Sequence, residues 1–386
     1  MIASITGPRL MLVGGGASAE IAAVLQRLGR ARPLVVSDKF MQASGPLGAL
    51  LGKLEASRID HGVFVDTVSD PTSDVIEAGV ARVRERDYDC LIALGGGSPM
   101  DTAKGIAILE TGGGHIRDYK VPKSADAARL PVICIPTTAG TGSEVTRFTV
   151  ITDTANDEKM LITGLGCLPQ AALVDYELTL TAPFRLTADT GIDALTHAIE
   201  AYVSKRANPV SDAYALTAMR TIYMHLRKAC FSPQDHAARA AMMLGATQAG
   251  LAFSNASVAL VHGMSRPIGA FFHVPHGLSN AMLLPAITAF SARDATLRYA
   301  QCARAMGVAD DGEGDQSAVN RLLDALDRLN RELEVPSPKA YGIDQARYFD
   351  VIDTMAEQAL ASGSPGNNPR VPTKDEIVAL YKQVWA

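Results

Sequence analysis

The first half of the chain alternates short apolar runs with amphipathic stretches and glycine-rich turns. We predict strands at the apolar runs RLMLVGG (9–15), PLVVSD (33–38), HGVFVD (61–66), DCLIALGGGS (89–98) and LPVICIPTT (130–138). Apolar residues recur every three or four positions in SAEIAAVLQRLG (18–29), DVIEAGVARVRER (74–86) and MDTAKGIAILE (100–110), which predicts helices. This rhythm predicts a parallel sheet flanked by helices. The uninterrupted apolar strands LIAL and VICI are typical of a sheet that is covered on both faces.

The pattern changes in the middle of the chain. The segments RFTVITD (147–153) and KMLITG (159–164) predict a pair of strands that form a hairpin. From about residue 185 the strand pattern ends, and helical spacing recurs in TADTGIDALTHAIEAYVS, DAYALTAMRTIYMHLRKA, HAARAAMMLGATQAGLAFS, DQSAVNRLLDALDRLNREL and ARYFDVIDTMAEQALAS. We therefore predict an α/β domain over residues 1–182 and an all-helical domain over 183–386, with the boundary at Pro183.

Size and composition fit this division. A chain of 386 residues is long for one hydrophobic core, and 47% apolar with 20% charged residues is the balance of a globular protein. The net charge of -5 offers no basic surplus for nucleic acid or an anionic membrane. No apolar run reaches the roughly 20 residues that span a bilayer. The five cysteines lack C-x-x-C spacing and the N-terminus lacks a signal-peptide pattern, so we expect reduced thiols in a cytoplasmic protein.

A glycine-rich turn follows one of the predicted buried strands. Gly95, Gly96, Gly97 and Ser98 lie between the strand and a helix that starts near Pro99. Glycines allow a ligand to approach the backbone closely, and the free N–H groups of a helix start favour phosphate. A tight turn without a ligand is the alternative.

Two further strand ends carry polar residues that suit a dinucleotide. Asp38 ends PLVVSD, where a carboxylate would accept hydrogen bonds from a ribose hydroxyl and repel a 2′-phosphate, so it favours NAD over NADP. The loop IPTTAGTGSEVT (135–146) ends another strand with hydroxyls and glycines suited to a pyrophosphate or ribose. One shared ligand explains both loops better than two unrelated polar loops do.

Acidic and histidine side chains form a candidate metal set in the second half. Asp193 and His197 are four residues apart in an apolar helix, which places them on one face. A buried carboxylate is costly unless it is paired or binds a metal, although a simple Asp–His hydrogen bond is the alternative. His262 and His276 each precede a glycine in turn-like sequence, and complete a set of one carboxylate and three imidazoles that suits Fe²⁺ or Zn²⁺.

The order of these motifs resembles that of the iron-containing, or group III metal-dependent, alcohol dehydrogenases. The likeness rests on GGGSPMDTAKGIA, PTTAGTGSEVTRFTVIT, TGIDALTHAIEAYVS, HGMSRPIGAFFHVPHG and NNPRVPTKDEIVALY, and it covers nearly the whole chain. It implies a Rossmann-like N-terminal domain and a helical metal-binding domain, the architecture shared with dehydroquinate synthase. It also implies hydride transfer between NAD(P) and a small alcohol or aldehyde, and a homodimer.

The resemblance also implies roles for individual residues. The metal ligands would be Asp193, His197, His262 and His276. The cofactor-binding residues would be Asp38, Gly95, Gly96, Gly97, Ser98, Asp101, Thr137, Thr138, Ser143 and Lys159, of which Lys159 would approach the nicotinamide ribose and act in catalysis. Phe148 and Phe253 would line the substrate pocket, although aromatic residues at such positions also occur as ordinary core.

The chain departs from the family pattern at three positions. Tyr176 stands where proline is common, and Arg266 stands where many members have a second histidine. His273 stands where asparagine or a similar residue is frequent, so we expect it to relay the alcohol proton, unless it is only structural. Arg266 predicts a substrate with an anionic tail, such as 4-hydroxybutyrate or succinic semialdehyde, unless it pairs with a neighbouring acid. A dehydroquinate synthase-like lyase and a metal-free reductase of the maleylacetate type are the alternative functions.

Overall fold

A computed structural model describes residues 2–156 and 158–386. It consists of two compact units. The sheet unit comprises Thr6–Ala182 and Gln234–Thr247, and the helical unit comprises Pro183–Pro233, Gln248–Ala386 and a short N-terminal segment that ends at Ile5. The helix α8 (His236–Ala256) contributes its first half to the sheet unit and its second half to the helical unit. The division into domains at residues 1–182 and 183–386, with one boundary at Pro183, stays a prediction.

The sheet unit is built on a parallel sheet with the strand order β1-β8-β5-β4-β2-β3. These strands are β1 (Leu10–Val13), β2 (Pro33–Asp38), β3 (Gly62–Thr67), β4 (Cys90–Gly95), β5 (Val132–Pro136) and β8 (Ala171–Val174). The predicted hairpin is present as β6 (Phe148–Asp153) and β7 (Glu158–Thr163), which pair antiparallel. The predicted α/β class is confirmed.

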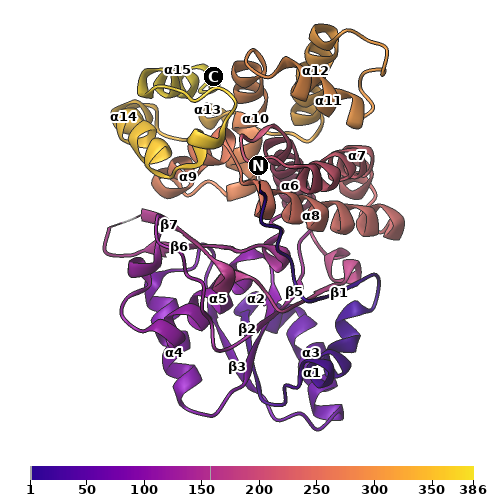
Figure 1. The fold of residues 1–386 in the computed structure, drawn as a ribbon, viewed down its shortest axis with the longest axis vertical. Coiled ribbons are helices and arrows are strands. Elements are labelled where there is room, and N and C mark those ends of the chain that lie inside the picture. The colour runs from indigo at the N-terminus through magenta and orange to yellow at the C-terminus, as the bar shows by residue number, and fades with distance from the viewer. Residues whose placement is uncertain (1, 157) are drawn as a thin grey trace. The chain divides into compact units, whose positions relative to one another are not determined.

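Helices cover both faces of the sheet (Figure 1). They are α1 (Ile21–Leu28), α2 (Lys39–Ser44), α3 (Pro46–Ala56), α4 (Ser73–Arg84) and α5 (Gly97–Gly112). Alternation along β4 explains the arrangement: Leu91 faces the core formed with α4 and α5, whereas Ile92 faces the core formed with α1 and α3. Both residues have no exposed surface, which is why the strand sequence is apolar throughout.

The helical unit contains no strand among the residues that the structure describes. Its helices are α6 (Phe184–Val203), α7 (Pro209–Phe231), the end of α8, α9 (Leu260–Phe272), α10 (His276–Ala292), α11 (Thr296–Ala305), α12 (Asp315–Glu332), α13 (Pro338–Tyr341), α14 (Gln345–Ala361) and α15 (Lys374–Val384). Helix α6 lies against α7 and α10, so it is surrounded by protein along most of its length. None of the described helices is long and apolar enough to cross a membrane.

Candidate active site

Helix α6 presents two of the predicted metal ligands side by side. Asp193 and His197 are one turn apart and both buried, at 2% and 4% exposure. The carboxylate oxygen Oδ1 of Asp193 lies 3.9 Å from Nε2 of His197. The spacing of four residues therefore brings the two polar groups together inside an apolar helix, as the sequence predicts.

The other two predicted ligands lie at the starts of helices rather than in turns. His262 is in the first turn of α9, and His276 is the first residue of α10. The glycine after each histidine serves close packing. A Cβ at Gly263 would lie 2.8 Å from Cδ of Pro365, and one at Gly277 would lie 2.4 Å from the main-chain oxygen of Asp189. The prediction that His262 and His276 open turns is therefore wrong, since both residues begin helices. The glycines that suggested turns are present because they allow neighbouring segments to touch.

Ligand atoms of three of these side chains lie close together, and the ring of His197 lies beside them. Candidate donor atoms of Asp193, His262 and His276 all lie within 4.8 Å of one another. Oδ1 of Asp193 is 3.3 Å from Nε2 of His262 and 3.9 Å from Nε2 of His276. The ring of His197 stacks on that of His262 with their centres 4.4 Å apart. One carboxylate and three imidazoles gathered in this way fit a divalent transition metal such as Fe²⁺ or Zn²⁺.

The charges of the cluster are mutually dependent. Burial opposes the charge on Asp193, but the three neighbouring imidazoles outweigh it and lower the pKa of the carboxyl below its usual value. Burial alone would lower the pKa of His262, but the carboxylates of Glu200 and Asp193 raise it above its usual value. The carboxylate is thus held ionised, as a metal ligand must be.

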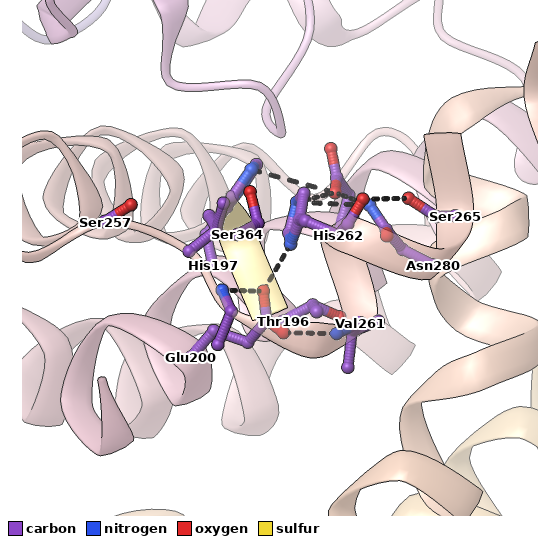
Figure 2. Close-up of polar contacts among 12 residues, drawn as sticks. Thr196, His197, Glu200, Ser257, Val261, His262, Ser265, Asn280 and Ser364 are labelled. Carbon is purple, nitrogen blue, oxygen red and sulfur yellow. Dashed lines mark hydrogen bonds and ion pairs between the residues drawn. The ribbon is translucent and has the colours of Figure 1, made fainter. Parts of the chain in front are cut away.

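Glu200 belongs to the same cluster, although the sequence analysis overlooked it (Figure 2). Its side chain is 2% exposed, and its Oε2 accepts a hydrogen bond of 2.6 Å from Nδ1 of His262. The same carboxylate accepts the main-chain N–H groups of Ala259 and Val261 at 3.0 and 2.6 Å. The signal was available, because Glu200 follows His197 by three residues on one buried helix, where an acid needs a partner.

Asn280 is a second residue of the cluster that no sequence motif indicates. It lies on α10, one turn after His276 and on the far side of His262 from Glu200 (Figure 2). Its Nδ2 donates to Oδ1 of Asp193 at 2.7 Å and lies 3.2 Å from Nε2 of both His262 and His276. The fully buried Asn280 therefore links three of the candidate ligands directly.

The remaining predicted residues of the helical unit occupy different surroundings. Phe253 stacks on His197 with ring centres 4.2 Å apart, so it forms one wall of the cluster. Arg266 is 9% exposed and donates from Nη1 to the hydroxyl of Ser364 at 2.8 Å. Burial lowers the pKa of Arg266 to about 10, while the charge of Glu200 opposes the shift. His273 is exposed at the end of α9, in the left-handed conformation with φ of 53°.

The predicted phosphate-binding turn lies between β4 and α5 of the sheet unit. Gly95 has φ of 148°, and Gly96 precedes the helix without any side-chain cap. A Cβ at Gly97 would lie 3.0 Å from Cγ2 of Thr141. The N–H groups at the start of this 16-residue helix therefore remain available to a phosphate. Such a phosphate would lie next to Gly96, Gly97 and the half-buried Ser98.

The loop after β5 lies beside this turn. Thr137 donates from its main-chain N–H to the oxygen of Gly95 at 2.9 Å. A Cβ at Gly96 would meet Cγ2 of Thr138 at 3.4 Å, and the buried hydroxyl of Thr138 has no hydrogen-bond partner among the described residues. Such an unpaired hydroxyl beside an open helix start suits a polar ligand. These contacts bring the two predicted cofactor loops together.

A buried lysine that the sequence analysis did not single out holds the end of this loop. Nζ of Lys104, on α5, donates to the main-chain oxygens of Ser143, Thr146 and Phe148 at 2.7, 3.1 and 2.8 Å. The hydroxyl of Ser143 donates to Asp101 at 2.8 Å. Ser143 and Asp101 therefore support the loop by internal hydrogen bonds, and Phe148 continues from it into β6.

Two predicted cofactor residues make their contacts elsewhere in the sheet unit. Asp38 ends β2 and accepts the main-chain N–H of Met41 at 2.8 Å, so it caps α2. Lys159 on β7 forms an ion pair of 3.0 Å with Asp70. Tyr176 approaches Nδ1 of His236 at 3.4 Å, which gives the residue at the unusual position a partner on α8.

Comparison with known proteins identifies the family of the chain. The model of the iron-containing alcohol dehydrogenase family matches residues 8–176, and the model of the C-terminal part of the Fe-containing alcohol dehydrogenase family matches residues 187–385. The chain is 36% identical to the NAD-dependent methanol dehydrogenase of Bacillus methanolicus over 376 residues, which is 97% of this chain and 98% of that protein.

Two further relatives span almost the full length. Lactaldehyde reductase of Escherichia coli (strain K12) is 35% identical over 374 residues, which cover 96% of this chain and 97% of that protein. The crystal structure of a 1,3-propanediol oxidoreductase superposes with a TM-score of 0.95 at 33% identity and covers 100% of both chains. The chain therefore belongs to the iron-containing alcohol dehydrogenase family.

Proposed function

We propose that the protein is a metal-dependent, NAD(H)-linked alcohol dehydrogenase and aldehyde reductase that acts on a small primary alcohol or aldehyde. The observation that carries the proposal is the cluster in which donor atoms of the buried Asp193 and His262 and of the half-buried His276 lie within 4.8 Å of one another. Membership of a dehydrogenase family supports the reaction type, and relatives named for methanol, lactaldehyde and 1,3-propanediol support the substrate class.

Asp193, His197, His262 and His276 would hold the metal, which we take to be Fe²⁺, with Zn²⁺ as the alternative. A metal bound there acts as a Lewis acid on the substrate oxygen. The protein buries Asp193, His197 and His262, which keeps bulk water from these three ligands, and Phe253 forms a wall against His197. Because the Asp193 carboxylate is ionised at neutral pH, it is ready to act as a ligand without losing a proton.

The sheet unit would bind NAD. The open N–H groups at the start of α5, next to Gly96 and Gly97, would hold the pyrophosphate, and the free hydroxyl of Thr138 would donate to it. Asp38 uses one lone pair of Oδ1 for the N–H of Met41, and its remaining lone pairs would accept a hydrogen bond from the ribose hydroxyl. Its negative charge would disfavour the 2′-phosphate of NADP. Thr137, Asp101, Ser143 and Lys159 would support the nicotinamide end. NAD supplies the hydride acceptor.

His273 would release the alcohol proton to solvent. Its exposed position at the end of α9, three residues before His276, allows its ring to exchange protons with water. A purely structural ring is the alternative. The pH–rate profile of His273→Ala separates the two, because an unchanged profile would rule out the relay.

Arg266 would select a substrate with an anionic tail, such as 4-hydroxybutyrate or succinic semialdehyde. A buried guanidinium bonded to a neutral hydroxyl can still bind a carboxylate. The competing role is that of a counter-charge to Glu200, whose charge influences Arg266. The test compares butanol with 4-hydroxybutyrate in wild type and Arg266→Ala. A loss confined to 4-hydroxybutyrate supports substrate selection, and equal losses contradict it.

The main test is a panel of alcohols and aldehydes with NAD and NADP in parallel, using enzyme reconstituted with Fe²⁺ or Zn²⁺. NADH formation from small primary alcohols, lost on chelation, is the expected result. Activity that survives chelation would favour a reductase of the maleylacetate type, and turnover of a dehydroquinate synthase substrate without net NADH would favour the lyase. We also infer a cytoplasmic homodimer, which light scattering and cell fractionation would test.

A further inference from the structure

We propose that Glu200 is the positioning residue of the metal centre: it fixes the tautomer of His262 and the start of α9 with a single carboxylate. This inference rests on the proposed metal site. Three hydrogen bonds converge on the carboxylate, from Nδ1 of His262 at 2.6 Å and from the N–H groups of Ala259 and Val261 at 3.0 and 2.6 Å. Glu200 is 2% exposed, so water does not compete for them.

The first consequence concerns the proton on the imidazole of His262. Both oxygens of Glu200 accept main-chain N–H groups, so its carboxylate also acts as the acceptor toward His262, and Nδ1 of His262 carries the hydrogen of that bond. In a neutral ring Nε2 then holds a lone pair. Nε2 is the nitrogen that lies 3.3 Å from Oδ1 of Asp193, inside the ligand cluster. Glu200 therefore keeps the hydrogen off the ligand nitrogen, whose lone pair faces Nδ2 of Asn280 at 3.2 Å in this structure, and makes that nitrogen a stronger donor.

The second consequence concerns the backbone that carries His262. Helix α9 starts after Ala259, whose methyl side chain provides no capping hydrogen bond. Glu200, which belongs to α6, accepts the N–H groups of Ala259 and Val261 in place of a local cap. A carboxylate at this end also interacts favourably with the helix dipole. The same side chain thus fixes the main chain on which His262 is mounted and the rotation of its ring.

The third observation is that Glu200 links two ligand-bearing helices. Asp193 and His197 precede it on α6 by two turns and one turn, and His262 follows the capped end of α9. Any shift of α6 relative to the start of α9 would stretch all three hydrogen bonds together. Glu200 therefore couples the position of the α6 ligands to that of His262.

Glu200→Gln is the sharpest test, because glutamine has nearly the same shape but only one acceptor oxygen. If the amide oxygen faces Val261, the amide N–H₂ group faces Nδ1 of His262. Nδ1 must then accept a hydrogen bond, so the imidazole hydrogen moves to Nε2, the ligand nitrogen. If the amide is turned over, its N–H₂ group opposes the N–H of Val261. Neither orientation satisfies all three donors. We expect the affinity for Zn²⁺ or Fe²⁺ to fall about 10- to 100-fold.

Asp175→Asn is the matched control. Asp175 is also 2% exposed and accepts the main-chain N–H groups of Gly16 and Ser18 at 3.0 and 3.1 Å, but among the described residues its hydrogen-bond partners include no histidine. Metal affinity is measured on folded protein by competition with a chelator, alongside thermal unfolding in the presence of excess chelator. We expect both variants to unfold at lower temperature and only Glu200→Gln to lose metal affinity. Equal metal affinity of wild type, control and Glu200→Gln would overturn the proposal.

A second measurement needs no variant of Glu200. Nitrogen-15 NMR of chelator-treated wild type, with the His262 signal assigned by its loss in His262→Gln, reports which ring nitrogen carries the hydrogen. A hydrogen on Nδ1 is expected, and a neutral ring with its hydrogen on Nε2 would refute the proposal even if Glu200→Gln failed to fold. Wild type that binds no metal but shows the Nδ1 hydrogen would instead refute the proposed function and leave the positioning role intact.

Discussion

Replacing Gly277 by alanine tests the account of how α10 is placed against α6. The new Cβ would lie 2.4 Å from the main-chain oxygen and 2.8 Å from the carbonyl carbon of Asp189, whereas Cβ contacts under 3.0 Å are essentially never found. The obstacle is backbone, so no rotamer change can relieve it. One of the helices must therefore move, and His276 is the residue next to the clash.

The expected cost of this overlap is about 1–3 kcal/mol in the free energy of unfolding. In a protein of this size each kcal/mol lowers the midpoint of thermal unfolding by roughly 2–4 °C or less. Because His276 moves with the start of α10, we also expect metal affinity to weaken about tenfold or more, since a bound metal requires its ligands within about 0.5 Å of their proper positions.

Gly52→Ala is the matched control. Gly52 lies within α3, and an added Cβ would meet nothing within 4 Å. Its replacement should raise stability by about 0.5–1 kcal/mol, because alanine favours a helix interior. Thermal unfolding and chelator competition are measured on both variants. Wild-type stability and metal affinity in Gly277→Ala would refute the close approach of α10 to α6.

Three further outcomes follow from the buried charges and the metal site. Lys104→Met should lower the free energy of unfolding by at least about 1–3 kcal/mol, because the carbonyls of Ser143 and Thr146 lose a buried donor. It should also weaken NAD binding, measured by calorimetry, whereas replacing the exposed Lys382 by Met should change neither the stability nor NAD binding. Burial raises the pKa of Glu144, so its contribution to the unfolding free energy should fall as pH rises above about 4.3, the unfolded value. Glu144→Gln should therefore make the slope of stability against pH shallower in denaturant titrations, and an unchanged slope would contradict this. Chelation should lower the unfolding midpoint and added Fe²⁺ or Zn²⁺ should restore it, whereas a midpoint insensitive to both would contradict a metal bound to the folded state.

The sheet unit was largely predictable, because its strands are short apolar runs between turns. The strands β2, β4 and β5 match the predicted runs closely. Strand β8 has only four residues and carries no distinctive pattern, so it was not predicted. The share of α8 in the sheet unit also gives no sequence signal, because its helical pattern continues unbroken across Thr247.

The helical unit shows why periodicity fails inside a core. Helix α10 was not predicted, because most of its residues are buried and show no one-sided apolar pattern, and because Pro285, which lies inside the continuous helix, usually indicates a helix end. Asp193, His197, His262 and His276 could be predicted as metal ligands from the sequence, because carboxylate and imidazole side chains are common metal ligands. The sequence marks Glu200 as a buried acid that needs a partner, but neither Glu200 nor Asn280 could be assigned to His262, because that assignment depends on which helices meet at the cluster. Long-range packing, not local pattern, brings them to His262.

The most direct test of the central claim is a titration of metal into chelator-treated enzyme with NAD and a small primary alcohol present. The account predicts that NADH formation is absent at the start, rises in proportion to added Fe²⁺ or Zn²⁺ and stops rising at one metal per chain. It also predicts that Asp193→Asn, at the centre of the cluster, requires far more metal for any response. Full activity before any metal is added, or saturation at one metal per chain in Asp193→Asn as in wild type, would contradict the account.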